Sequence, residues 1–518
     1  MTGAGSHGWS RFLRVAAARG EAPAFIEDGG VTTFAALRSL AGGWAEHAGA
    51  EVGPGERVIV WSCNSVAMAA AILGVWSRGA IPVLLGAQTP LRHLVHAATL
   101  TDAVLVAAEP SQVEAARKAT GRPATALEPC DGLVDLSAGG ANAEPPASIL
   151  FTSGSTGLPK GVVQSHRSLQ EGCDAVALSL GLTAEDRILC GVAWAFDYGW
   201  GQLLSTFFLG VPQALPAAPD PIAICDASTR HQPSMLAAIP PLLAGLTQGV
   251  SGIERADLSS IRMVTNTGSH IAPAVFRDVL HWFPHAAVSL NYGLTETYRT
   301  ASLDPALARA HPDSVGRAIP GVEIAVVDED GAPVAPGAVG EVVHRGAGIF
   351  LGYWGDEAAT AQVRRPDPLW RHPGVAAPPA VYTGDLGFLD PEGLLRLTGR
   401  RDRQIKSMGV RVSPEEIEAI LVGSGLVREA AVLSRPHDTI GDLVVAVVAP
   451  DGSRVDLVDA LKRMARQEMS PFMQPRQYEV ADALPRTANG KVDYPALRRR
   501  YVDVPTPADT AQPRRGAA

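Results

Sequence analysis

Residues 151–161 read FTSGSTGLPKG, a stretch that holds three glycines, four hydroxyl side chains and one lysine. Strand-like apolar residues precede it, and GVVQ (161–164) follows it, so we expect a glycine-rich loop between two strands. Glycine lets backbone N–H groups approach phosphate oxygens, and Ser and Thr add donors. The spacing is not that of P-loop NTPases, because Lys160 is followed by Gly161 rather than by Ser or Thr. The stretch therefore predicts a triphosphate loop of another kind.

Outward from this loop, strand-like and helix-like segments alternate along the first 400 residues. RVIVW (57–61) precedes a helical segment at 65–79, which is followed by IPVLL (81–85) and later by AVLVAA (103–108). Such alternation predicts a largely parallel sheet covered by helices. Short strand-like runs between turns then predict a β-rich section over 312–397.

The last hundred residues indicate a compact α+β segment. QIKSMGVRV (404–412) is strand-like, and SPEEIEAIL (413–421) is helical. Ser413 with Glu416 predicts a capping box, and Ile417, Ile420 and Leu421 are expected on one buried face. The polar, proline-rich residues 502–518 are expected to be a disordered tail.

Composition and charge narrow the class of protein. The chain has 518 residues, 46% of them hydrophobic, and a formal net charge of −9, which argues against nucleic acid as a partner. Five cysteines without a CxxC pair predict buried free thiols. The N-terminus lacks a signal-peptide core, and the most apolar run, 66–76, is too short to span a bilayer. We expect a soluble, cytoplasmic protein without membrane insertion.

Three further motifs carry candidate chemistry. NYGLTETYRT (291–300) offers an aromatic face for a nucleobase and the oxygen ligands of a Thr–Glu pair for Mg²⁺. YTGDLG (382–387), followed by GRRDRQIK (399–406), offers a carboxylate for ribose hydroxyls. PRTANGKVD (485–493) displays a lysine after an Asn-Gly turn. Each of these motifs is weak alone.

Taken together and in this order, the motifs resemble those of the ANL superfamily of adenylate-forming enzymes, which includes acyl-CoA synthetases, peptide-synthetase adenylation domains and luciferases. The resemblance extends from EAPAFIEDGG (21–30) to Lys491. It implies an α/β fold with a large N-terminal domain of mixed and parallel sheets (1–401) and a mobile α+β C-terminal domain (402–501). It also implies that a carboxylate attacks the α-phosphate of ATP, releasing pyrophosphate, and that a thiol then takes the acyl group.

The resemblance assigns roles to individual residues. Lys491 would contact the attacking carboxylate and the α-phosphate, Thr295 would contact the α-phosphate, and Glu296 would hold Mg²⁺. The other ATP-binding residues would be Thr152, Ser153, Gly154, Ser155, Thr156, Gly157, Lys160, Gly268, Ser269, Asn291, Tyr292, Asp385 and Arg400. The acid pocket would include Asp197, Tyr198, Gly201, Ala238, Thr265, Thr267, His270, Arg299 and Thr300. Asp402 would be the hinge, and Gly409 would lie in the loop that turns toward the thiol.

The residues of the predicted pocket do not determine which carboxylic acid is the substrate. Asp197 stands where amino-acid-activating members pair an aspartate with the substrate ammonium, which favours an amine-bearing acid. Arg299 would bind a second acidic group, or it would neutralise Asp197 in an enzyme for acyl or aryl acids. His270 departs from the family pattern, and both a ligand role and steric fill stay open for it.

The acceptor is also open. GKVD (490–493) resembles carrier-loading adenylation domains. Because the chain ends soon after this motif, we expect the acceptor to be CoA or the phosphopantetheine of a separate carrier protein. Transfer to an amine in a specialised biosynthetic pathway is an alternative. An inactive scaffold is disfavoured, because Lys160, Glu296, Asp385 and Lys491 are all present.

Overall fold

The chain forms two compact units in the computed structural model, which describes residues 7–48, 50–132, 144–152, 158–269, 271–407, 410–437, 441–452, 456–487 and 490–503. The first unit comprises Met1–Gly337, Val342–Thr383 and Leu389–Arg396. The second comprises Ala338–Glu341, Gly384–Phe388 and Leu397–Ala518. The boundary after residue 401 stays a prediction.

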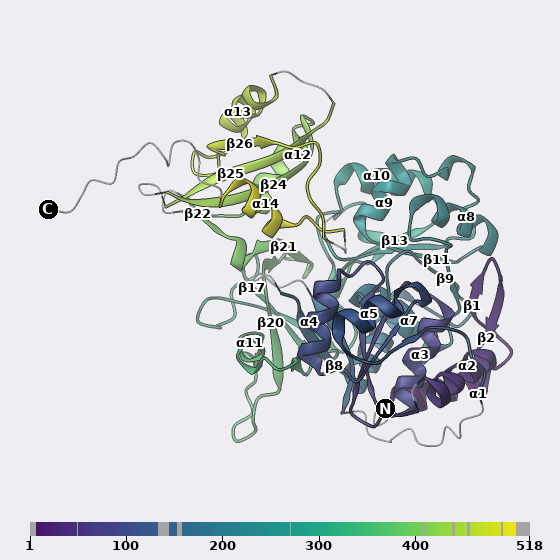
Figure 1. The fold of residues 1–518 in the computed structure, drawn as a ribbon. Helices are drawn as coiled ribbons and strands as arrows, with labels where there is room; N and C mark the ends of the chain where they lie inside the picture. Colours follow the sequence, from purple (N-terminus) through teal and green to yellow (C-terminus); the bar gives the residue numbers. More distant parts are fainter. Residues whose placement is uncertain are drawn as a thin grey trace. The chain divides into compact units, whose positions relative to one another are not determined.

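The first unit contains two large sheets (Figure 1). Over the described residues, the nine-stranded sheet has the order β15-β14-β13-β12-β11-β9-β10-β1-β2. Its strands are β1 (Pro23–Glu27), β2 (Gly30–Thr33), β9 (Ile188–Cys190), β10 (Gln213–Ala214), β11 (Met235–Ala238), β12 (Met263–Asn266), β13 (Ala287–Tyr292), β14 (Ala301–Ser302) and β15 (Arg317–Ala318). The seven-stranded sheet has the order β18-β8-β7-β4-β3-β5-β6. Its strands are β3 (Arg57–Ser62), β4 (Ile81–Gly86), β5 (Leu105–Ala108), β6 (Ala124–Ala126), β7 (Pro146–Thr152), β8 (Lys160–Ser165) and β18 (Gly352–Tyr353).

Alternating side chains show how the sheets and helices are layered. In β3, Val58 and Val60 belong to the core that joins the two sheets, whereas Ile59 and Trp61 belong to the opposite core. The joining core also holds α1 (Gly8–Arg19), α2 (Phe34–His47), α3 (Val66–Ser77), α6 (His166–Leu180) and α7 (Asp197–Leu209). The outer face of the seven-stranded sheet is covered by α4 (Leu91–Thr101) and α5 (Val113–Thr120). The outer face of the nine-stranded sheet is covered by α8 (Pro221–His231), α9 (Pro240–Gln248) and α10 (Pro273–Trp282).

The pairing of these strands confirms the predicted parallel sheet covered by helices. β3 pairs in parallel with both β4 and β5, and β11, β12 and β13 are parallel neighbours. The pair β7 and β8 is antiparallel, with Thr152 opposite Lys160. The glycine-rich stretch therefore joins two neighbouring strands of one sheet.

The section over 312–397 is rich in strands, as the sequence indicates. Within the described residues it contains β16 (Val322–Val327), β17 (Gly340–Gly346), β19 (Arg364–Pro366), β20 (Pro379–Leu389) and β21 (Leu395–Arg400) in one sheet. It also contains α11 (Glu357–Val363), a helix that the sequence analysis did not predict.

The second unit contains an α+β segment. Its sheet has the order β23-β22-β25-β24, with β26 paired to β25. The elements are β22 (Ile405–Ser407), β23 (Val410–Val412), α12 (Pro414–Gly423), β24 (Val427–His437), β25 (Gly441–Pro450), α13 (Leu457–Glu468), β26 (Gln477–Val480) and α14 (Tyr494–Tyr501). QIKSMGVRV, predicted to be strand-like, contributes the antiparallel strands β22 and β23. Residues 504–518, most of the predicted tail, lie outside the described residues.

The predicted capping box at Ser413 is wrong. Ser413 is the N-cap of α12 and Pro414 begins the helix, but the Ser413 hydroxyl accepts no backbone N–H of the helix. It donates instead to the Thr398 carbonyl at 2.7 Å and contacts a Glu415 carboxylate oxygen at 2.9 Å. The predicted apolar face does form, because Ile417 and Leu421 are fully buried and Ile420 is half-buried.

The structure bears on two expectations for the chain: the state of its cysteines and the absence of a membrane-spanning helix. All five cysteines are free of disulfides, but Cys63 is exposed and Cys130 is half-buried, so the expected burial holds for only three of them. Among the described residues, every helix is too short or too polar to cross a lipid bilayer.

Candidate active site

The base of the glycine-rich loop is fixed by the pairing of β7 with β8. Thr152 ends β7 and Lys160 begins β8, so their backbones face each other across the ladder. Between them, the predicted phosphate ligands Ser153, Gly154, Ser155, Thr156 and Gly157 lie outside the described residues.

Lys160 and the predicted magnesium ligand Glu296 contact the same aromatic side chain. The Lys160 Nζ lies 5.0 Å from the centroid of the Tyr353 ring, and the Tyr353 hydroxyl donates to Glu296 Oε1 at 2.7 Å. Tyr353 reaches this place because β18 pairs with β8, with Tyr353 opposite Val162. Sequence reasoning missed Tyr353, because nothing in its local sequence marks it as a neighbour of Glu296.

The Thr–Glu motif is anchored through its backbone. The Gln164 side-chain amide donates to the Thr295 carbonyl at 3.1 Å, and the Phe350 N–H donates to the Glu296 carbonyl at 3.0 Å. The Thr295 residue is buried, and Glu296 is half-buried. The two residues are thus tied to β8 and to the segment before β18, so Lys160 and Glu296 are held by one framework.

A second group of predicted residues lines a pocket in the first unit. Its walls come from α6, from the start of α7 and from the segments that follow β12 and β13, where ligands bind in open α/β sheets. The lining residues are Val176, Asp197, Tyr198, Gly201, Gln202, Thr267, Gly293, Tyr298 and Arg299. Five of the residues predicted for the acid pocket therefore come together here.

Asp197 and Arg299 line this pocket without forming an ion pair. Arg299 is only 5% exposed, yet in the part of the chain that the structure describes its guanidinium has no hydrogen bond or salt bridge. The central carbon of the guanidinium lies 5.6 Å from the centroid of the Tyr198 ring. Burial lowers the pKa of Arg299, and the negative charge of Asp197 opposes that shift. The alternative in which Arg299 directly neutralises Asp197 is not the arrangement observed.

Tyr298 has a strained backbone at the pocket wall. Its φ is +61°, in the left-handed region that bulky residues rarely adopt. A Cβ added at Gly172 of α6 would lie 2.4 Å from the Tyr298 ring, and one at Gly201 of α7 would lie 3.2 Å from its hydroxyl. Two helices therefore provide the space for Tyr298 through glycines. Sequence reasoning missed this side chain, although these glycines are a signal of close packing.

Replacing Gly172 with alanine is expected to destabilise the protein by about 1–3 kcal/mol, because the new methyl group would overlap the Tyr298 ring. Chemical denaturation would measure the loss. Gly423→Ala in α12 is the matched control, since no heavy atom lies within 4 Å of the added Cβ. Equal stability of the two variants would contradict the tight packing inferred for Tyr298.

Polar groups of the pocket lining and of the adjoining strands bond to one another. The Tyr198 hydroxyl donates to the Thr265 carbonyl at 2.7 Å, and burial raises the pKa of Tyr198. The Asn291 amide donates to Thr265 Oγ1 at 2.8 Å and to the Asn266 carbonyl at 2.9 Å. The Thr267 hydroxyl donates to the Asn291 carbonyl at 3.2 Å. Asn291 and Thr265 thus join β12 to β13 beneath the pocket, and Thr265 is not among the lining residues.

Other predicted residues are placed away from the pocket lining. Thr300 is fully buried, and its hydroxyl lies 3.0 Å from Nδ1 of His344, whose pKa burial lowers to about 4. Ala238 is fully buried in β11, outside the lining residues. Gly268 and Ser269 are exposed after β12, and Tyr292 is buried at the end of β13. His270 lies outside the described residues.

In the second unit, the predicted ribose residues form an ion-pair chain. Arg400 donates from Nη1 to Asp385 at 2.8 Å and from Nε to Asp402 at 3.0 Å. Burial lowers the pKa of Arg400, but the two carboxylates more than offset that and raise it. Asp385 is thus held beside a fixed positive charge, and the predicted hinge residue Asp402 belongs to the same chain.

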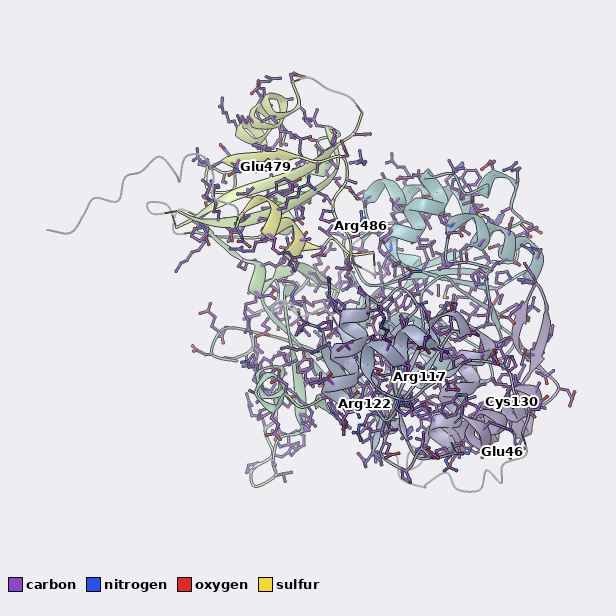
Figure 2. All side chains as sticks on the ribbon, viewed as in Figure 1. Glu46, Arg117, Arg122, Cys130, Glu479 and Arg486 are labelled. Carbon is purple, nitrogen blue, oxygen red and sulfur yellow. The ribbon has the colours of Figure 1, made fainter. Side chains whose placement is uncertain are left out.

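Lys491 is exposed in the second unit, at the end of a braced turn. Its carbonyl accepts the Thr487 N–H at 2.8 Å. Arg486, labelled in Figure 2, donates to the Gly490 carbonyl at 2.7 Å and pairs with Glu429. Thr487 and Gly490, the described residues that precede Lys491, are therefore held by hydrogen bonds. Gly409 lies outside the described residues.

These features fit the class of adenylate-forming enzymes: a lysine after a glycine-rich stretch and a pocket lined by Asp197 and Arg299 in one unit, and an exposed lysine in the second. The family described as "AMP-binding enzyme" matches residues 12–354, and its "AMP-binding enzyme C-terminal domain" matches residues 416–491. The chain therefore belongs to the AMP-binding enzyme family, that is, to the ANL superfamily. This confirms the family, the fold class and the enzyme class of AMP-forming ligases predicted from the sequence.

The similar proteins are named for different reactions. The delta-poly-L-ornithine synthetase of Acinetobacter baumannii is 31% identical over 363 residues; the match covers 68% of this chain but only 26% of that relative. A feruloyl-CoA synthase of an Amycolatopsis species is 30% identical, over 87% of this chain and 90% of its own. The amide bond synthetase McbA of Marinactinospora thermotolerans superposes with a TM-score of 0.82 at 28% identity, over 96% of this chain and 100% of its own.

Proposed function

We propose that the protein activates an amine-bearing carboxylic acid with ATP, forming an acyl-adenylate and pyrophosphate, and then transfers the acyl group to a pantetheine thiol. The observation that carries the proposal is Asp197, which lines the pocket at the first turn of α7 without an ion-pair partner among the described residues. A carboxylate so placed is complementary to a substrate ammonium group and unfavourable for an unsubstituted fatty acid.

The phosphate side of the site fits Mg²⁺–ATP. Mg²⁺ is usually bound by one or two carboxylates together with substrate phosphates, and Glu296 offers such a carboxylate. The ion, when bound, would neutralise phosphate charge. Lys160 would supply positive charge for the pyrophosphate leaving group, and the Tyr353 hydroxyl would orient Glu296 from 2.7 Å. In the second unit, Asp385 would bind ribose beside Arg400.

Pyrophosphate exchange with Asp197 variants tests the choice of acid. Asp197→Asn is expected to lower kcat/KM for amino acids roughly 10- to 100-fold, because the charge-assisted contact with the ammonium group is lost. The des-amino counterparts should be affected far less. The measurement is ATP–pyrophosphate exchange with amino, aryl and fatty acids. Exchange with fatty acids and none with amino acids would contradict the proposed substrate class.

A second acceptor has support from one comparison. McbA, named as an amide bond synthetase, aligns over 96% of this chain, so transfer to an amine is the second candidate for the last step. To distinguish transfer to a thiol from transfer to an amine, the purified enzyme is incubated with ATP, the acid and one acceptor at a time: CoA, a phosphopantetheinyl carrier protein or a primary amine. Mass spectrometry then shows whether a thioester or an amide forms.

A further inference from the structure

The pocket is lined by a positive charge that has no salt-bridge partner among the described residues. Arg299 is 95% removed from solvent, and among the described residues its guanidinium has neither a hydrogen bond nor an ion pair. Leaving a charged group buried without a partner is costly, and native proteins normally pair such groups. Its guanidinium lies 5.6 Å from the centre of the Tyr198 ring, a contact that orients the group without neutralising it.

The neighbouring residues leave this charge to be met by a ligand. Among the described lining residues, Asp197 is the one carboxylate, and no nitrogen of Arg299 lies within 4.0 Å of its oxygens. Gln202 and Thr267 are neutral, and Thr267 donates to a backbone carbonyl. The pocket thus presents a carboxylate and a guanidinium at separate points. Neither forms a salt bridge among the described residues, although the charge of Asp197 partly offsets the burial of Arg299.

We infer that the acid activated here is an amino dicarboxylic acid, whose second carboxylate is bound by Arg299 while its ammonium group is bound by Asp197. This inference rests on the proposed function, because the first carboxylate must remain free to attack ATP. A guanidinium and a carboxylate match as a planar, bidentate pair, which favours arginine over lysine at such a position. Tyr298, strained and packed against Gly172, forms the adjoining wall.

Matched substrate pairs test the inference on the unaltered protein. Pyrophosphate exchange is measured with glutamate and glutamine, aspartate and asparagine, and 2-aminoadipate and norleucine. The dicarboxylic member of at least one pair should be preferred by roughly tenfold or more, since the neutral member leaves Arg299 unpaired. Preference for the neutral or apolar member in every pair would overturn the inference.

Variants of Arg299 then locate the preference. Arg299→Gln is expected to lower kcat/KM for the dicarboxylic acid roughly 10- to 100-fold and to lower kcat/KM for its neutral partner far less. Arg299→Lys should restore part of the preference, because the charge is kept and the bidentate geometry is lost. If Arg299 had only a structural role, its replacement would instead lower kcat/KM for both substrates equally.

The outcomes separate this inference from the proposed function. Exchange with amino acids that is insensitive to the second carboxylate, and equally so in Arg299→Gln, would overturn the inference and leave the proposed function standing. Absence of exchange with every acid, carboxylic or aminocarboxylic, would overturn the proposed function and the inference with it.

Discussion

Replacing Lys491 with alanine is expected to lower the rate of acyl-adenylate formation roughly 10²-fold or more. In this step a carboxylate must approach an α-phosphate that is also negatively charged, so a preorganised cation removes a large part of the barrier. Lys491 is suited to deliver such a charge, because it is exposed and follows the turn that Arg486 braces through the Gly490 carbonyl.

The two half-reactions separate this role from a general loss of folding. Pyrophosphate exchange measures the first, and thioester formation from a supplied acyl-adenylate measures the second. We expect the second to survive largely in Lys491→Ala. Lys462→Ala, at an exposed lysine of α13 in the same unit, is the matched control and should retain both. Equal damage to both half-reactions in Lys491→Ala would contradict the role assigned to this lysine.

Periodicity predicted the sheets of the first unit well, for a physical reason. In β3 and β4 nearly every residue is buried, because helices or the other sheet cover both faces, and buried parallel strands show as continuous apolar runs. The helix between them, α3, is apolar on all sides because the joining core surrounds it.

In the second unit, contacts between distant parts of the chain determined details of the structure that the local sequence did not predict. The Ser413–Glu416 pattern predicts a capping box, but β21 brings the Thr398 carbonyl within reach of the Ser413 hydroxyl, which then donates to it. QIKSMGVRV is strand-like in composition, but composition did not show that its two ends would pair with each other as β22 and β23. A single sequence does not show which carbonyl group or which strand a given residue will contact in the folded chain.

In the candidate site too, residues that stand in sequence motifs could be predicted, whereas residues that tertiary contacts bring to the site could not. Lys160, Glu296 and Asp197 could be predicted because they stand in motifs of the ANL superfamily. Tyr353 and Tyr298 could not, because they reach the site through strand pairing and through space left by Gly172. Whether Arg299 pairs with Asp197 also depended on a distance between α7 and the segment after β13, which no local pattern sets.

Replacing Glu296 with glutamine is expected to lower adenylation roughly 10²-fold at limiting Mg²⁺ and to raise the Mg²⁺ concentration needed for half-maximal exchange at least tenfold. Glutamine keeps the size of the side chain and can still accept from the Tyr353 hydroxyl, so the change removes mainly the negative charge. Titration of Mg²⁺ in the exchange assay, with calorimetry of Mg²⁺–ATP binding, measures the effect on activity and on binding separately. An unchanged Mg²⁺ requirement would contradict the assignment of Glu296.

Tyr353→Phe tests the same carboxylate from its other side. This variant keeps the ring beside Lys160 and the charge of Glu296, but it removes the 2.7 Å hydrogen bond. A hydrogen bond to a charged group contributes about 1.5–3 kcal/mol at most, so the shift in Mg²⁺ requirement should be smaller than in Glu296→Gln and in the same direction. In Glu296→Gln/Tyr353→Phe the two effects should not add, because the tyrosine acts only through the carboxylate it orients. Additive losses would instead mean that Tyr353 acts on the nucleotide through Lys160, whose ammonium group lies 5.0 Å from the centre of its ring.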